Sequence, residues 1–156
     1  MKVIRGIPPV ANWTPCALTI GNFDGVHRGH QALLKKLVQT AKEKNIQSCV
    51  MTFEPHPIEY FAPEKAPARI LNLRDKLEAL AEVGIDQVLV IHFNQLFANL
   101  SPDDFVKKIL VDSLKVQSIL IGDDFHYGSK RAGNFSNLVE AGLKYGFSVE
   151  NMSTFE

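Results

Sequence analysis

The feature that most constrains the fold is a regular alternation of short apolar runs with segments of helical periodicity. Strand-like runs occupy residues 17–20, 48–53, 87–93 and 118–121, and a further run begins near Phe147. Apolar residues recur at helical spacing after each of the first four runs. This alternation is typical of a parallel sheet whose strands are joined by crossover helices. We therefore predict a single α/β domain with an open, doubly wound parallel sheet of about five strands and helices on both faces.

Helix start and stop signals agree with this order of elements. The clearest start is Ser101-Pro102-Asp103-Asp104, which offers an N-cap, a proline at the first helical position and an acidic first turn. Three other helices are expected. One follows Gly29, one begins with Asn72 as its N-cap and stops at Gly84, and one near the end of the sequence is closed by Gly146.

Composition and charge exclude several partner classes. Lysine plus arginine and aspartate plus glutamate are equal at 17 each, so no global field attracts nucleic acid, and a phosphate site must be local. No run of about 18 apolar residues suggests a membrane span, and no apolar stretch near the N-terminus has the form of a signal peptide. Cys16 and Cys49 lie in apolar runs without disulfide-framework or zinc spacing. We expect a cytoplasmic protein without nucleic-acid or membrane partners.

The first strand-to-helix loop carries the strongest candidate ligand site. In an open parallel sheet, ligands bind beyond the carboxyl ends of the strands where the strand order reverses, here between the first and fourth predicted strands. Gly21, Gly25 and Gly29 let the backbone approach a ligand, and His27 and His30 fall at the start of the helix. Two imidazoles three residues apart share one helix face beside free N–H groups, which favours a polyphosphate ligand.

Two other interpretations of this loop stay open. The glycines can form a tight turn whose two histidines only face solvent. In the second interpretation, His27 and His30 bind a zinc ion together. The sequence supplies no evident further ligands, and we assign no metal-binding residue. The loop is neither a Walker loop nor a G-x-G-x-x-G fingerprint.

The loop after the fourth strand combines two carboxylates with a basic pair. Asp123 and Asp124 are suited to a ribose, a base or a magnesium shell, and Arg131, which follows Lys130, is suited to a phosphate. The alternative is a solvated turn.

A third loop, Thr52-Phe-Glu-Pro-His-Pro57, ends the second strand beside the same crevice. Glu54 and His56 are candidates to position a ligand, and Phe53, Tyr60 and Phe61 are candidates for an aromatic wall around a flat ring. A rigid proline turn with core aromatics is the alternative. Neither a G-x-S-x-G turn nor a catalytic cysteine setting is present, so the sequence favours chemistry by positioning over a covalent intermediate.

These three loops together resemble a known family. Gly21-Asn-Phe-Asp-Gly-Val-His-Arg-Gly-His30 contains the His-x-Gly-His signature of nucleotidylyltransferases. With Thr52-Phe-Glu-Pro-His-Pro57 and Gly122-Asp-Asp-Phe-x-Tyr-Gly-x-x-Arg-x-Gly-Asn134 it resembles the N-terminal half of the bifunctional prokaryotic FAD synthetases. The resemblance covers residues 1–156 and implies a Rossmann-like domain that transfers AMP from ATP to FMN, giving FAD and pyrophosphate with Mg²⁺.

The resemblance also implies residue roles. His27 and His30 would hold the ATP phosphates and stabilise the leaving pyrophosphate, and Arg131 would act with Asp124 where the substrates meet. The remaining assignments are to nucleotide binding (Gly21, Asn22, Phe23, Asp24 and Gly29) and to flavin binding (Phe61, Asp124 and Tyr127).

The sequence departs from this family pattern at its end. Met152-Ser-Thr-Phe-Glu156 stands where the family continues into Ser-Ser-Thr-x-x-Arg. We expect this motif and the C-terminal riboflavin kinase domain to be missing, and the chain to bind ATP and FMN with reduced or no turnover. Another His-x-Gly-His nucleotidylyltransferase and a non-catalytic flavin or nucleotide-binding module remain the alternatives.

Overall fold

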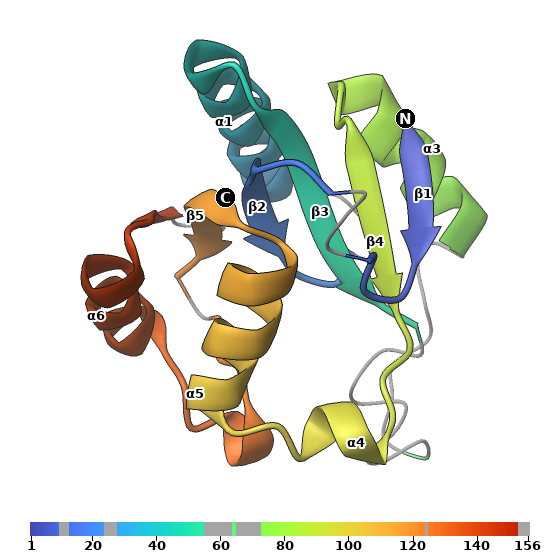
Figure 1. Ribbon diagram of the computed structural model, residues 1–156. Helices are drawn as coiled ribbons and strands as arrows, with labels where there is room; N and C mark the ends of the chain where they lie inside the picture. Colours follow the sequence, from blue (N-terminus) through green and yellow to red (C-terminus); the bar gives the residue numbers. More distant parts are fainter. Residues whose placement is uncertain (10–12, 24–27, 55–63, 65–72, 124, 153–156) are drawn as a thin grey trace.

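The computed structural model describes residues 1–9, 13–23, 28–54, 64, 73–123 and 125–152. Figure 1 shows an open sheet with helices packed on both sides.

Within the described residues, the sheet has six parallel strands in the order β1-β4-β3-β2-β5-β6. Their bounds are β1 Lys2–Arg5, β2 Cys16–Ile20, β3 Gln47–Phe53, β4 Gln87–Ile91, β5 Val116–Gly122 and β6 Ser148–Met152. The five predicted strands are confirmed within a few residues. The sequence prediction missed β1, because this short edge strand is mostly exposed and lacks a buried apolar run.

Helices follow the strands largely as expected. Their bounds are α1 Arg28–Lys44, α3 Leu73–Val83, α4 Gln95–Ala98, α5 Pro102–Asp104, the π-helix η3 Phe105–Ser113, the 3₁₀ turn η4 Ser129–Arg131 and α6 Phe135–Tyr145. The predicted caps at Ser101 and Gly146 are confirmed: Ser101 Oγ accepts a hydrogen bond from the Asp104 N–H at 3.1 Å, and Gly146 has a left-handed φ of 89°. The predicted cap Asn72 lies outside the described residues. The short α4 and the π-helical hydrogen bonding of η3 were not expected.

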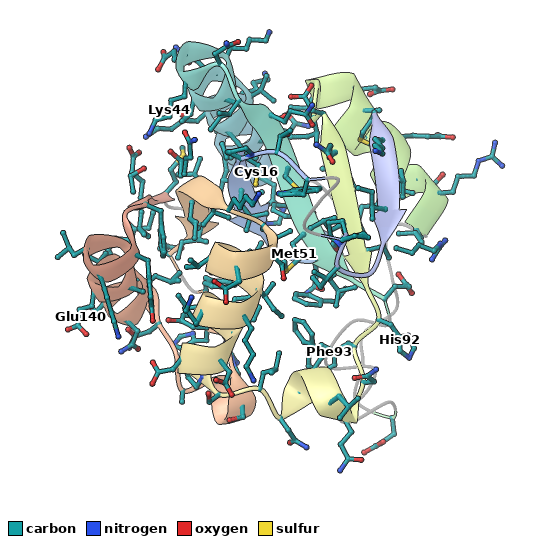
Figure 2. All side chains as sticks on the ribbon, viewed as in Figure 1. Cys16, Lys44, Met51, His92, Phe93 and Glu140 are labelled. Carbon is teal, nitrogen blue, oxygen red and sulfur yellow. The ribbon has the colours of Figure 1, made fainter. Side chains whose placement is uncertain are left out.

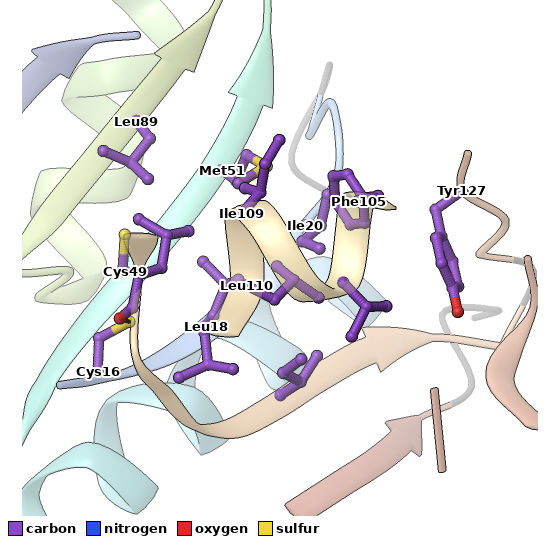
Figure 3. Packing of buried hydrophobic residues seen from close by; sticks show 14 of the residues in the cluster. Cys16, Leu18, Ile20, Cys49, Met51, Leu89, Phe105, Ile109, Leu110 and Tyr127 are labelled. Carbon is purple, nitrogen blue, oxygen red and sulfur yellow. Dashed lines mark hydrogen bonds between the residues drawn. The ribbon is translucent and has the colours of Figure 1, made fainter. Parts of the chain in front are cut away.

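Alternate residues of the central strands belong to two separate cores. Ala17, Val50 and Val88 lie in a buried cluster with residues of α1 and α3. Their neighbours in sequence, such as Met51 and Leu89, lie in the second cluster, with residues of η3 and α6 (Figure 3). Both faces of the sheet are therefore covered, and the predicted doubly wound α/β fold is confirmed.

Both cysteines are free and fully buried on the face covered by η3 (Figure 3). Burial, together with the neighbouring Cys16, raises the pKa of the Cys49 thiol well above its usual value. The thiol is therefore protonated and unreactive at neutral pH. Among the residues that the structure describes, no helix is sufficiently long and apolar to cross a membrane.

Candidate functional site

The three predicted site loops follow three neighbouring strands, at the end of the sheet where the carboxyl ends of the strands lie. β2 pairs in parallel with β3 on one side and with β5 on the other, so the carboxyl ends of all three strands meet there (Figure 1). The chain runs outward from β2 through β3 to β4 and then returns to β5. The reversal of strand order between β2 and β5 is the switch point at which open α/β sheets bind ligands.

Residues Gly21–Phe23, called here the Gly21–Phe23 turn, leave β2 and are held from β3. The Gly21 N–H donates to Met51 O at 3.0 Å, and Thr52 Oγ1 donates to Asn22 O at 3.3 Å. A Cβ at Gly21 would lie 3.0 Å from the Phe23 ring, so glycine allows the ring to fold back over the turn. Asn22 Oδ1 is buried and has no hydrogen-bond partner among the described residues, which makes it an acceptor for a ligand donor.

His30 lies in the first turn of α1 and is half-buried. Its ring meets the Phe23 ring edge-to-face, with centroids 5.2 Å apart and planes at 72°. Phe23 has a left-handed φ of 51° and is 5% exposed, packed in the same cluster as Leu33. A buried ring in a strained backbone conformation therefore fixes the orientation of His30 at the helix N-terminus. Asp24 and His27 lie outside the described residues.

The loop after β5 is closed by a short antiparallel bridge between Tyr127 and Gly133, with N···O distances of 3.1 and 2.9 Å. Tyr127 is 6% exposed, and its ring centroid lies 5.4 Å from that of Phe105 and 5.8 Å from that of Phe125. Burial first, and then the negative charge of Asp103, raise the pKa of Tyr127 to about 12. Most of the ring is in the core, so the surface that it offers to a flavin is small.

Arg131 belongs to the same loop but, unlike the buried Tyr127, lies at the surface. It is exposed, has a left-handed φ of 53°, and its Nη2 lies 3.5 Å from His126 Nδ1. A non-glycine residue in this conformation marks a loop whose shape is imposed by its surroundings. The guanidinium is therefore presented to solvent by a tied-down turn. Asp124 lies outside the described residues.

Beyond β3 and β4, aromatic side chains gather at the same edge. Ring centroids separate Phe53 from Phe93 by 5.7 Å and from Phe97 by 5.5 Å, and Phe93 is labelled just past β4 in Figure 2. Phe53 was predicted as part of an aromatic wall. Phe93 and Phe97 were missed, although Phe93 lies only two residues after the end of β4. Phe61 lies outside the described residues, and His92 is exposed.

A buried lysine is the other feature that the sequence prediction missed. Lys76 of α3 is 3% exposed, and its Nζ donates to Thr52 Oγ1 at 3.2 Å. Its position three residues after Leu73 and four before Leu80, on the apolar side of α3, was the available signal. Among the described side chains, no three of His, Cys, Asp or Glu gather as a metal site.

The fold, the reversal of strand order and the position of His30 define a doubly wound α/β domain with a candidate anion-binding site at its switch point. Residues 10–156 match the FAD synthetase family. The chain is 48% identical over 157 residues to a bifunctional riboflavin kinase/FMN adenylyltransferase of Escherichia coli, which covers 99% of this chain and 50% of the relative. It is 49% identical over 160 residues to the enzyme of the same name from Pseudomonas fluorescens, and this match covers 100% of the chain and 50% of that relative.

The chain therefore belongs to the FAD synthetase family, and it spans about half the length of the curated relatives that it matches. A crystal structure described as a macrolide-efflux protein from Streptococcus pneumoniae has a TM-score of 0.78 over 98% of this chain and 52% of that chain, at 22% identity. This likeness shows the fold alone.

Proposed function

We propose that the chain is an FMN adenylyltransferase, which makes FAD and pyrophosphate from ATP and FMN. An oxygen of the FMN phosphate attacks the α-phosphorus of ATP, and the bond from that phosphorus to the pyrophosphate oxygen breaks. The observation that carries the proposal is the placement of His30. It is held by Phe23 in the first turn of α1, at the switch point of a chain in the FAD synthetase family.

The α1 N-terminus and the histidines bind the phosphates of ATP. Free N–H groups and the positive end of the helix dipole attract anions, and His30 is already oriented there. His27, one residue before α1, joins it in stabilising the charge that develops on the pyrophosphate. Gly21, Asn22, Phe23, Asp24 and Gly29 line the nucleotide, and the buried Asn22 Oδ1 accepts from a donor of the ligand.

Arg131 and Asp124 lie where the two substrates meet. Two anionic phosphates must approach each other, and an exposed guanidinium in a fixed loop conformation lowers that repulsion. Phe61 and the edge of Tyr127 border the flavin ring. The alignment of the two substrates supplies the rest of the barrier reduction.

The Asp123 carboxylate is a donor of the type that Mg²⁺ prefers. Asp123 is exposed directly after β5, and Mg²⁺ in nucleotide sites is held by one or two carboxylates together with substrate phosphates. When bound, the ion neutralises phosphate charge. Asp123 would hold it on the β5 side of the crevice.

We place the domain beside a riboflavin kinase domain and in the cytoplasm. The relatives are named for both activities, and this chain matches half of their length. The two buried free cysteines are compatible with a reducing compartment.

Calorimetric titration of Mg·ATP and then FMN tests the proposal. We expect both to bind the wild type, and the combined His27→Ala and His30→Ala variant to bind ATP at least about tenfold more weakly, because two charge-assisted contacts are lost. His92→Ala, an exposed histidine after β4, is the matched control and should bind ATP as the wild type does. Unchanged ATP affinity in the double variant would remove the phosphate-binding assignment.

The choice of acceptor separates the alternatives. The protein, in excess over the nucleotide, is mixed with one acceptor at a time: FMN or pantetheine phosphate with ATP, or a cytidylyl acceptor with CTP. The products of a single turnover are then separated by chromatography. FAD formed from FMN alone supports the proposal. Product from another acceptor identifies a different nucleotidylyltransferase, and tight flavin binding without ATP binding identifies a flavin-binding module.

A further inference from the structure

Lys76 brings a positive charge into the interior below the proposed nucleotide site. It is 3% exposed, although lysine is almost never fully buried without partners. Its Nζ lies 3.2 Å from Thr52 Oγ1, which is itself fully buried at the end of β3. The lysine therefore joins α3 to the strand that borders the site.

Thr52 passes this contact on to the Gly21–Phe23 turn. Its hydroxyl donates to Asn22 O at 3.3 Å. A hydroxyl has one hydrogen, and the lysine ammonium can only donate, so the direction of both hydrogen bonds is determined. The chain of contacts runs from Lys76 through Thr52 to the backbone of Asn22.

The Asn22 carbonyl belongs to the peptide bond that joins Asn22 to Phe23, whose backbone is strained. That residue keeps its φ of 51° while its ring holds His30 edge-to-face. A conformation of this kind persists only where its surroundings impose it. The hydrogen bond from Thr52 anchors the turn to β3. The buried ammonium of Lys76 polarises the Thr52 hydroxyl that donates this bond.

We propose that Lys76 is a positioning residue that acts through Thr52 to hold the Gly21–Phe23 turn, and with it His30, in the conformation that binds the ATP phosphates. The inference rests on the proposed function and adds to it a residue in α3, outside the three loops. Lys76 acts on the turn and not on the substrate.

The test uses a matched pair at position 52 and a neutral isostere at position 76. Thr52→Val keeps the side-chain volume and removes the hydroxyl, whereas Thr52→Ser keeps the hydroxyl. We expect Thr52→Val and Lys76→Met each to raise the Kd for Mg·ATP about tenfold, and Thr52→Ser to stay within about twofold of the wild type. The Thr52→Val and Lys76→Met double variant should bind no more weakly than the weaker single variant, because both changes break one chain of contacts.

Ser48→Ala controls for a general loss of stability. Ser48 lies on the same strand at its opposite end, is buried, and its hydroxyl contacts Asp86 Oδ2 at 3.2 Å. This variant should lower the Tm and leave the Kd for ATP unchanged. Thermal unfolding of every variant is measured beside the calorimetry, and if Lys76→Met does not fold, the Thr52→Val and Thr52→Ser pair decides.

Three results would overturn the inference while leaving the proposed function intact. They are wild-type ATP affinity in Thr52→Val or Lys76→Met, additive losses in the double variant, and an equal loss in Ser48→Ala. Failure of the wild type to bind ATP would overturn the proposed function and this inference with it.

Discussion

Gly133→Ala should destabilise the loop after β5 through a single steric contact. A Cβ at position 133 would lie 2.5, 2.6 and 2.7 Å from three carbons of the Tyr127 ring, whereas ordinary contact begins near 3.4 Å. Gly133 does not have a left-handed φ, so alanine can adopt its backbone conformation and only the ring is in the way. Because Tyr127 is 6% exposed and its ring packs on Phe105, the ring must be pushed about 1 Å into the core. Overpacking of this kind costs about 1–3 kcal/mol.

Thermal unfolding followed by circular dichroism measures this cost. In a domain of this size, about 1–3 kcal/mol corresponds to a fall in Tm of about 2–12 °C. In a Tyr127→Leu background the smaller side chain leaves room, and the added cost of Gly133→Ala should fall below about 0.5 kcal/mol. A wild-type Tm for Gly133→Ala, or an equal cost in both backgrounds, would show that the Tyr127 ring is not the obstacle.

Three further changes test packing, capping and titration. Gly142→Ala should cost about 3 kcal/mol by urea denaturation, because its Cβ would lie 2.4 Å from the backbone oxygen of Phe147, which cannot rotate away; a loss below about 0.5 kcal/mol would contradict this. Ser101→Ala should cost about 1 kcal/mol by the same measurement, because the Asp104 N–H loses its acceptor, while Ser101→Asp should keep most of the stability. The folded state raises the pKa of Tyr127 from 10.0 to about 12, so the stability that the neutral phenol contributes is complete below pH 10 and is lost as the pH rises towards 12. Tyr127→Phe should therefore lose less stability than the wild type over that interval, and parallel losses in the two proteins would refute the assignment.

The fold could be predicted because its main signals are local. Apolar runs of strand length, an N-cap at Ser101 and a left-handed terminator at Gly146 each act within a few residues. β1 could not be predicted in this way. Its four residues gain their place from pairing with β4, more than eighty positions later in the chain, and an edge strand needs no apolar pattern of its own.

The candidate site was predictable where a motif places residues at the end of a strand. His30 and the Gly21–Phe23 turn lie at the switch point because β2 ends at Ile20 and α1 begins at Arg28. Tyr127 shows where such reasoning reaches its limit. The spacing of a loop motif places the residue near the crevice, but the ring's orientation depends on Gly133 and Phe105, and these contacts turn it into the core.

Lys76 could not be assigned from the sequence for a related reason. A lysine within a helix is ordinarily solvated, and its aliphatic stem is tolerated beside apolar residues such as Leu80. What makes Lys76 different is a hydroxyl acceptor supplied by another strand, Thr52 Oγ1 at 3.2 Å, in a place that water does not reach. The cost of burying the ammonium is offset by that partner, and the same partner holds the Asn22 carbonyl. A buried cation of this kind acquires its role only when α3 and β3 are packed together, so its function follows from the tertiary structure and not from its neighbours in the chain.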